Sequence, residues 1–133
     1  MGDWAKSALV LTLLEANYDN DMGMRRNVAL KFDEEYNAIY FYTHWGAATL
    51  EDTLRNALKR GRERWDDPPY LARIIFSEMI QDEVMDTLGY GIAPYVMDDE
   101  FPTIAVDLRQ RTVNGVPFQE FTTFAPCEPS ASE

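Results

Sequence analysis

The stretch NVALKFDEEYNAIYFYTHWGA, residues 27–47, determines the fold expected for this chain. Val28, Leu30 and Phe32 alternate with polar or small residues, which is the period-2 pattern of a half-buried strand. Residues 38–44 are rich in β-branched and aromatic side chains, which favours a second strand. The connection between the two runs is short and polar, so they are predicted to form an antiparallel hairpin.

A helix is expected directly after this hairpin. Thr49 and Asp52 form a capping-box-like pattern at its start, in which each side chain can bond a backbone N–H of the first turn. Apolar or small residues then recur at helical spacing, namely Leu50, Leu54, Ala57, Leu58 and Gly61. The pattern predicts an amphipathic helix with one buried face.

A second helix is expected to begin at the DDPPY segment. Asp66 or Asp67 can serve as its N-cap, and Pro68 and Pro69 suit a first turn, where backbone N–H groups have no helical partner. Its apolar residues cover a wide face, which indicates a deeply placed helix: Leu71, Ile74, Ile75, Phe76, Met79 and Ile80. The helix is expected to end near Gly89 or Gly91.

The last third of the chain is predicted to form strands. Residues 92–98 and 103–108 are the first two, and the Asn114-Gly115 pair that follows is a strong hairpin signal. Residues 116–124 are expected to return as an edge strand. The prediction is therefore an α+β fold, with a mainly antiparallel sheet of about five strands and two central helices on one face.

The chain is expected to form one such domain with an extension at each end. Residues 3–17 read as an additional N-terminal helix, capped by Asp3 and followed by a polar linker. The expected division is a helix and linker over 1–21, the α+β domain over 22–124 and a flexible tail over 125–133.

Composition excludes several classes of function. The chain has 23 acidic and 12 basic residues, a formal net charge of −11, which argues against nucleic-acid binding through overall charge. A single cysteine, Cys127, and a single histidine, His44, cannot build the usual zinc sites, and no cofactor is expected. The longest apolar run, residues 8–14, is too short to span a membrane, and no signal peptide is indicated, so the expected location is the cytoplasm.

His44 is the first residue to consider for chemistry. It follows an aromatic strand and precedes Trp45 and Gly46, so its ring can face a cleft and act as a base near neutral pH. No local motif supplies a nucleophile or an orienting partner. Two other interpretations stay open: a packed ring that bonds a backbone group, and a contact to a ligand or partner.

Two short motifs carry a resemblance to a known group of proteins. They consist of Met22, Gly23 and Arg25, and of Tyr42, His44, Trp45 and Gly46. With them, residues 22–80 resemble small uncharacterised proteins of bacteriophages, prophages and bacterial genomes. The chain departs from that group in its preceding helix and in Ala47, where a second glycine is often found. The resemblance implies a mobile-element setting and no particular reaction.

Charged residues are unevenly distributed along the sequence. Six of the 12 bases lie close together, Arg55, Lys59, Arg60, Arg62, Arg64 and Arg73, whereas residues 74–108 contain eight acids and no base. A solvated helix with internal ion pairs is the plain interpretation. The functional one is an anion- or partner-binding site made by His44, Trp45, Arg60, Arg62, Arg64 and Trp65, with Tyr70 as a further aromatic anchor.

The acidic residues give a second candidate surface. It comprises Asp82, Glu83, Asp86, Asp98, Asp99 and Glu100, with Glu78 nearby. Such a run is often a solvated turn, but it can also bind a basic partner or imitate nucleic-acid phosphates. On this basis we expect a non-enzymatic acidic binding protein of phage or mobile-element type that docks onto a host protein or a nucleic-acid-binding complex. Its sharpest form is an inhibitor of a host-defence complex, anti-CRISPR or anti-restriction.

Two other classes of function remain open. One is a small enzyme or nucleotide-binding protein that holds an anion with His44 and the Arg60–Arg64 region. The other is an oligomeric or structural role in which residues 3–17 mediate self-association.

Overall fold

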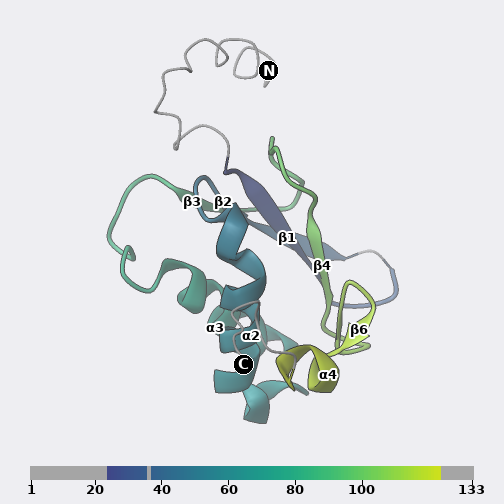
Figure 1. The fold of residues 1–133 in the computed structure, drawn as a ribbon. Coiled ribbons are helices and arrows are strands. Elements are labelled where there is room, and N and C mark those ends of the chain that lie inside the picture. Colours follow the sequence, from purple (N-terminus) through teal and green to yellow (C-terminus); the bar gives the residue numbers. More distant parts are fainter. Residues whose placement is uncertain (1–23, 36, 124–133) are drawn as a thin grey trace.

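The predicted hairpin lies inside a six-stranded sheet (Figure 1). The computed structural model describes residues 24–35 and 37–123. Strand β1 (Arg26–Lys31) pairs antiparallel with β2 (Ala38–Thr43), and Val28 lies opposite Phe41. The other strands are β3 (Tyr90–Ala93), β4 (Ile104–Asp107), β5 (Thr112–Val113) and β6 (Val116–Pro117). The α+β fold class predicted from the sequence is confirmed.

The strand order is β3-β2-β1-β4-β5-β6, and one pairing makes the sheet mixed. Strand β1 pairs with β4 in parallel, with Val28 opposite Ile104, whereas the other pairings are antiparallel. Because β3 and β4 lie on opposite sides of the β1–β2 hairpin, the chain between them must cross the sheet. Residues 94–103 make this crossing.

Helices α2 (Leu50–Arg60) and α3 (Pro68–Ile80) pack on one face of the sheet, and the short α4 (Phe118–Thr123) packs against α2 and the β5–β6 hairpin (Figure 1). Two short 3₁₀ turns, Ala47–Thr49 and Arg62–Arg64, flank α2. The core between the layers is apolar, and its fully buried members include Val28, Leu30, Leu54, Leu58, Leu71, Ile75, Ile104 and Val106. The period-2 and helical patterns of the sequence therefore identified the buried faces correctly.

Three element boundaries differ from the prediction. Helix α3 ends at Ile80, not near Gly89, because residues 81–89 form turns. Strand β3 stops at Ala93, since Pro94 lacks the N–H that a continuing strand needs, and residues 94–98 are irregular. Residues 118–123 form helix α4 instead of an edge strand, because Phe118, Phe121 and Thr122 are buried at helical spacing.

The predicted capping box of α2 is wrong in its detail. Thr49 is the N-cap residue, but its side chain makes no cap hydrogen bond; the Thr53 hydroxyl instead donates to the Thr49 carbonyl at 3.1 Å. Asp67 is the N-cap of α3, also without a side-chain bond, and the two prolines occupy the first turn as predicted. The expected helix over 3–17 and the tail over 125–133 lie outside the described residues.

Candidate functional site

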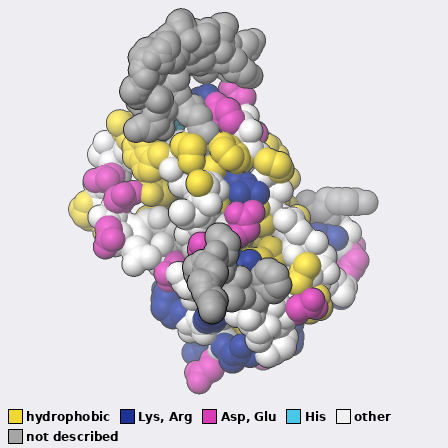
Figure 2. All heavy atoms as spheres, viewed as in Figure 1, with side chains coloured by type: hydrophobic (Ala, Val, Ile, Leu, Met, Phe, Trp, Pro, Cys, Tyr) yellow, Lys and Arg dark blue, Asp and Glu magenta, His cyan; other side chains and the backbone are white. Residues whose placement is uncertain are grey.

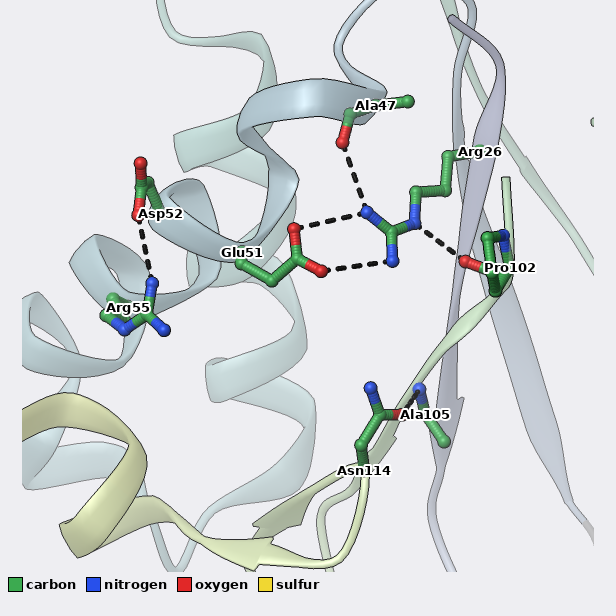
Figure 3. Close-up of polar contacts among 8 residues, drawn as sticks. All are labelled: Arg26, Ala47, Glu51, Asp52, Arg55, Pro102, Ala105 and Asn114. Atoms are coloured by element: carbon green, nitrogen blue, oxygen red, sulfur yellow. Dashed lines mark hydrogen bonds and ion pairs between the residues drawn. The ribbon is translucent and has the colours of Figure 1, made fainter. Parts of the chain in front are cut away.

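Arg26 is the centre of a polar cluster that lies largely buried between β1, α2 and the segment before β4 (Figure 3). Its position on β1 points inward, in the same register as Val28, and only 9% of the residue is exposed. Its guanidinium donates to the Ala47 carbonyl at 3.1 Å and to the Pro102 carbonyl at 2.7 Å. It also binds both carboxylate oxygens of Glu51, at 3.1 and 3.0 Å.

This cluster joins three parts of the fold. It ties the start of β1 to the first turn of α2 and to the residues just before β4. All the partners come from the chain itself, so the guanidinium is engaged by protein groups. We therefore interpret Arg26 as a structural residue. Sequence reasoning missed it, although its inward register was readable from the alternation with Val28.

The crossing segment 94–103 is held to β1 by two further clusters. The fully buried Asn27 amide donates to Asp99 at 2.7 Å and to the Met97 carbonyl at 2.8 Å, and it accepts from the Met97 N–H at 3.0 Å. Arg25 forms a bidentate ion pair with Glu100, and the two residues also bond through their backbones. The Glu100 carboxylate raises the pKa of the Arg25 guanidinium.

The six acids predicted to bind a partner are thereby divided into two groups. Asp99 and Glu100 serve as internal anchors, and Glu83 accepts a hydrogen bond from the Tyr90 hydroxyl. Burial and the Glu83 carboxylate together raise the pKa of Tyr90 to about 12. Asp82, Asp86 and Asp98 are exposed, and none of them forms an ion pair within residues 24–35 and 37–123.

His44 is partly buried at the junction between β2 and the Ala47–Thr49 turn. Its Nδ1 shares a hydrogen bond of 3.3 Å with the Tyr42 hydroxyl, and its ring meets the Trp45 ring edge-on at a centroid distance of 5.1 Å. The His44 N–H donates to the Gly89 carbonyl at 2.8 Å. Burial raises the pKa of Tyr42, so this hydroxyl is a neutral partner at ordinary pH. These contacts support the interpretation of a packed ring.

The predicted basic residues gather at the far end of α2, where Figure 2 shows Lys and Arg side chains below the helices. Arg60 is engaged by Glu78 at 2.9 Å and by Ser77 at 2.8 Å. Arg62 lies over the Trp65 ring at 4.4 Å and donates to Gln119. The Trp65 indole itself donates to the Leu58 carbonyl at 2.9 Å.

The remaining bases of this end are exposed. Arg64 lies over Tyr70 at 5.4 Å, and Lys59 and Arg73 point to solvent. Arg62, Arg64, Lys59 and Arg73 make no ion pair with the part of the chain that the structure describes.

The predicted anion site is not assembled as a single site. His44 and Trp45 precede α2, whereas Arg62 and Arg64 follow it. A helix of 11 residues separates them, which corresponds to roughly 16 Å. The two halves of that candidate site therefore lie at opposite ends of the helix.

Large apolar side chains are exposed on strand β3, on the two connections that flank it, and just after β2 at Trp45. We call this set the β3 flank; it comprises Trp45, Val84, Met85, Leu88, Ile92, Tyr95 and Val96. Met85 is 86% exposed and Leu88 is 74% exposed, values typical of surface lysines rather than of core residues. Figure 2 shows hydrophobic side chains in a band across the region of β2 and β3.

The flank contacts the rest of the fold at two points. Gly89 adopts a φ of +103°, and a Cβ built there would lie 2.6 Å from the Trp45 ring, so backbone and indole are in close contact. Val96 is adjacent to Met97, which Asn27 holds by two hydrogen bonds. The sequence does not predict the flank, because apolar residues outside a helical or strand pattern give no sign of whether their side chains are buried or exposed. Asp82, Asp86 and Asp98 lie beside these residues in the chain, so the exposed acids and the apolar flank belong to the same segments.

Two kinds of feature are absent from the described residues. No group of three or more His, Cys, Asp or Glu side chains within residues 24–35 and 37–123 is arranged to hold a metal ion. Among the helices that the structure describes, none has the length and apolar character needed to cross a membrane. Comparison of the chain with protein-family models, curated proteins and solved structures gave no match.

Proposed function

We propose that this protein is a non-enzymatic binding protein that docks onto another protein through the β3 flank and its exposed acids. The observation that carries the proposal is the concentration of seven large, exposed apolar side chains around one edge strand. Exposed apolar patches mark interaction sites in proteins that otherwise cover their apolar groups. Aromatic residues and methionine, both present here, are enriched at interface centres.

The exposed acids give the proposed partner its chemistry. Asp82, Asp86 and Asp98 carry negative charge next to the apolar side chains, and the chain as a whole carries −11. A partner with an apolar patch rimmed by Lys or Arg would be steered toward this surface and held in one orientation. Since Asp99 and Glu100 are internal anchors, we assign docking to the three exposed acids only.

The finer form of the proposal is an inhibitor encoded by a phage or another mobile element. It rests on the acidic charge and on the resemblance of residues 22–80 to small phage and prophage proteins. A host-defence complex that binds nucleic acid, such as an anti-CRISPR or anti-restriction target, presents the basic groove that an acidic docking surface fits.

The docking surface is tested by capture from a host lysate with matched variants of the full chain. Met85→Asp with Leu88→Asp places charge on two highly exposed positions of the flank, where the fold does not depend on them. Tyr70→Asp is the control, because Tyr70 is 54% exposed but lies at the far end of α2. Far-UV circular dichroism verifies that all variants fold.

A host protein identified by mass spectrometry should bind the control as well as it binds the parent chain. Its affinity for the double flank variant should fall at least about tenfold, as expected when central contacts are lost. Charge reversal of Asp82, Asp86 and Asp98 to lysine should weaken binding and reduce its salt dependence. Equal capture by the parent and both flank variants would exclude this docking surface.

A second candidate function is anion binding at the basic end of α2. It is favoured by the Arg62 guanidinium stacked on Trp65 and by three further exposed bases. Titration with inorganic phosphate or a nucleotide, followed through the Trp65 indole resonance, tests this function. A shift that Arg62→Gln with Arg64→Gln abolishes would support it, and an unmoved resonance at millimolar ligand would exclude it.

A further inference from the structure

Strand β3 is an edge strand whose outer side meets no other strand of the described chain (Figure 1). One step beyond its pairing with β2, the His44 N–H donates to the Gly89 carbonyl at 2.8 Å, so these opposite residues form a hydrogen-bonded pair. Bonded and non-bonded pairs alternate along an antiparallel ladder. Tyr90 and Ile92 therefore belong to non-bonded pairs, and their main-chain N–H and C=O groups point away from β2.

The ladder between β1 and β2 gives the same alternation independently. Next to it, the Phe32 N–H donates to the Asn37 carbonyl at 2.9 Å, so every second residue of the second strand, counted from Asn37, bonds to β1. Tyr40 and Tyr42 are left to bond β3. Outside this ladder, no hydrogen bond among residues 24–35 and 37–123 uses the outward main-chain groups of β3.

The other edge of the sheet is closed to a further strand. Strand β6 has two residues, of which Pro117 lacks an N–H, and helix α4 follows it directly. Proline, lysine and very short length are the means by which proteins protect an edge. The four residues of β3 include neither proline nor lysine, and Pro94 ends the strand after about 14 Å. Strand β3 is thus the edge that can accept another strand.

An added strand would also extend the apolar layer of the sheet. Ile92 lies opposite Phe41, so both side chains are on the face that the helices cover. Phe41 is 2% exposed and packs against Phe76 at a centroid distance of 4.8 Å, whereas Ile92 is 58% exposed at the end of this layer. An apolar residue placed beside Ile92 would cover it, and its neighbours along the strand would point to the opposite face.

The charge around β3 determines which kind of strand fits. Asp82 and Asp86 precede β3, Asp98 follows it, and all three are exposed. Residues 74–108 contain no base. An incoming segment with Lys or Arg is therefore attracted, whereas a second copy of this chain would bring the same three acids together, which is repulsive.

We propose that β3 takes up an extended segment of the partner protein as an additional antiparallel strand. The segment carries an apolar residue beside Ile92 and Lys or Arg at alternate positions. The inference rests on the proposed function, because it gives the binding mode of that docking surface. In strand addition, main-chain hydrogen bonds provide affinity and alternate side chains provide specificity.

A model peptide tests the added strand on the full chain. The probe is acetyl-Lys-Val-Lys-Val-Lys-Val-Lys-amide, titrated into the nitrogen-15-labelled protein to millimolar concentration. The amide protons of Tyr90 and Ile92 should shift and become protected from hydrogen exchange. Those of Gly91 and Ala93, which bond β2 already, should keep the protection that they have without peptide. The peptide with Glu in place of Lys should not bind.

Two N-methylated peptides separate a strand from a charged ligand. In an antiparallel pair, the residues that bond Tyr90 and Ile92 lie directly opposite them, with side chains on the same face. Methyl groups on the valine nitrogens should therefore weaken binding at least about tenfold. Methyl groups on the inner lysine nitrogens keep the same charge but lie on the outer edge, and this peptide should still bind. Equal binding of the two methylated peptides, or no shift at Tyr90 and Ile92, would overturn the inference.

A matched pair of variants tests the same edge from the side of the protein. Ile92→Pro removes an outward N–H without breaking a bond to β2, whereas Ile92→Ala keeps that N–H. The proline variant should bind the unmodified peptide at least about tenfold more weakly than the alanine variant. Retained exchange protection of the Gly91 amide shows that β3 is still paired. The methylated peptides are compared on the parent chain, so that comparison does not depend on the folding of either variant.

Other outcomes identify a different occupant or separate this inference from the proposed function. Protection of Tyr90 and Ile92 that grows with protein concentration, without peptide, would overturn the inference in favour of a second copy. Capture of a host protein that Ile92→Pro leaves unchanged would keep the docking surface and overturn strand addition. Peptide binding with the expected methylation pattern, together with capture that Met85→Asp with Leu88→Asp leaves unchanged, would keep strand addition and remove the docking role of the flank.

Discussion

The substitution Glu51→Gln is expected to destabilise the protein by about 2 kcal/mol. Glu51 supplies the carboxylate that binds the Arg26 guanidinium through both oxygens, at 3.1 and 3.0 Å. Glutamine keeps the size and one acceptor but removes the charge. Arg26 would then remain in its buried position with neutral acceptors only, the Ala47 and Pro102 carbonyls and the glutamine amide oxygen.

The magnitude follows from the exposure of the two side chains. Removing one member of a fully buried ion pair costs about 3–5 kcal/mol, because a charge is left without compensation. The Arg26 side chain is 10% exposed and approaches that limit, whereas the Glu51 side chain is 42% exposed and is partly screened by water. The two retained carbonyl bonds reduce the loss further, which gives about 2 kcal/mol.

Asp52→Asn is the matched control. Asp52 also lies in the first turn of α2, so both variants lose the same favourable interaction with the helix dipole. Its carboxylate is 48% exposed and pairs with Arg55 one turn further along the same helix, at 2.9 Å. Such a pair contributes about 0.3–0.5 kcal/mol and joins no separate elements.

Urea unfolding followed by circular dichroism measures both variants, with an unchanged m-value as the condition for comparison. Glu51→Gln should cost about 1–2 kcal/mol more than Asp52→Asn. In an Arg26→Met background this difference should disappear. Equal costs for the two variants, or a Glu51→Gln cost that persists without Arg26, would show that the ion pair does not hold β1 to α2.

Two further predictions concern Gly89 and Tyr90, which lie next to the Trp45 ring. Gly89→Ala should cost about 2–3 kcal/mol, because φ is +103° and the new Cβ would meet the indole at 2.6 Å; Gly115→Ala, at φ +86° in open space, should cost about 1 kcal/mol, and thermal melting compares them. Burial and Glu83 raise the pKa of Tyr90 from 10.0 to about 12, so the folded state keeps a proton that the unfolded state loses. This stabilisation is complete below pH 10.0 and is lost as pH rises to about 12. Tyr90→Phe should therefore flatten the fall in stability across that window by about 1 kcal/mol, a value reduced for solvent screening, and parallel urea-unfolding profiles for the two chains would contradict it.

The parts of the fold that the sequence predicted are those with a local signal. The hairpin follows from the alternation around Val28, α2 and α3 from their apolar spacing, and the β5–β6 turn from Asn114-Gly115. In that turn Asn114 has a φ of +49° and Gly115 a φ of +86°, the backbone that this residue pair favours.

The parts that the sequence could not predict depend on distant partners. The parallel pairing of Val28 with Ile104 joins residues far apart in the chain, and no local pattern records it. The Asn114-Gly115 hairpin signal predicts a returning strand over 116–124, but residues 118–123 form helix α4 although Phe and Thr favour strands. The packing of Phe118 against Trp65, at a centroid distance of 5.3 Å, outweighs that preference.

The candidate binding surfaces also depend on distant partners, and the sequence predicts them less well than it predicts the fold. Acidic residues close in sequence were grouped as one docking surface, yet burial of Asn27 draws Asp99 inward while Asp98 stays exposed. A carboxylate that anchors a segment and a carboxylate that contacts a partner look identical in the sequence. Their roles differ because of the residues that each one faces in the folded protein. Here the anchors hold residues 94–100 against β1, and this fixes Tyr95 and Val96 at the surface. The acidic run therefore contributes to the proposed docking surface in two ways, through the exposed charge of Asp98 and through the positions that the internal charges impose on the apolar residues.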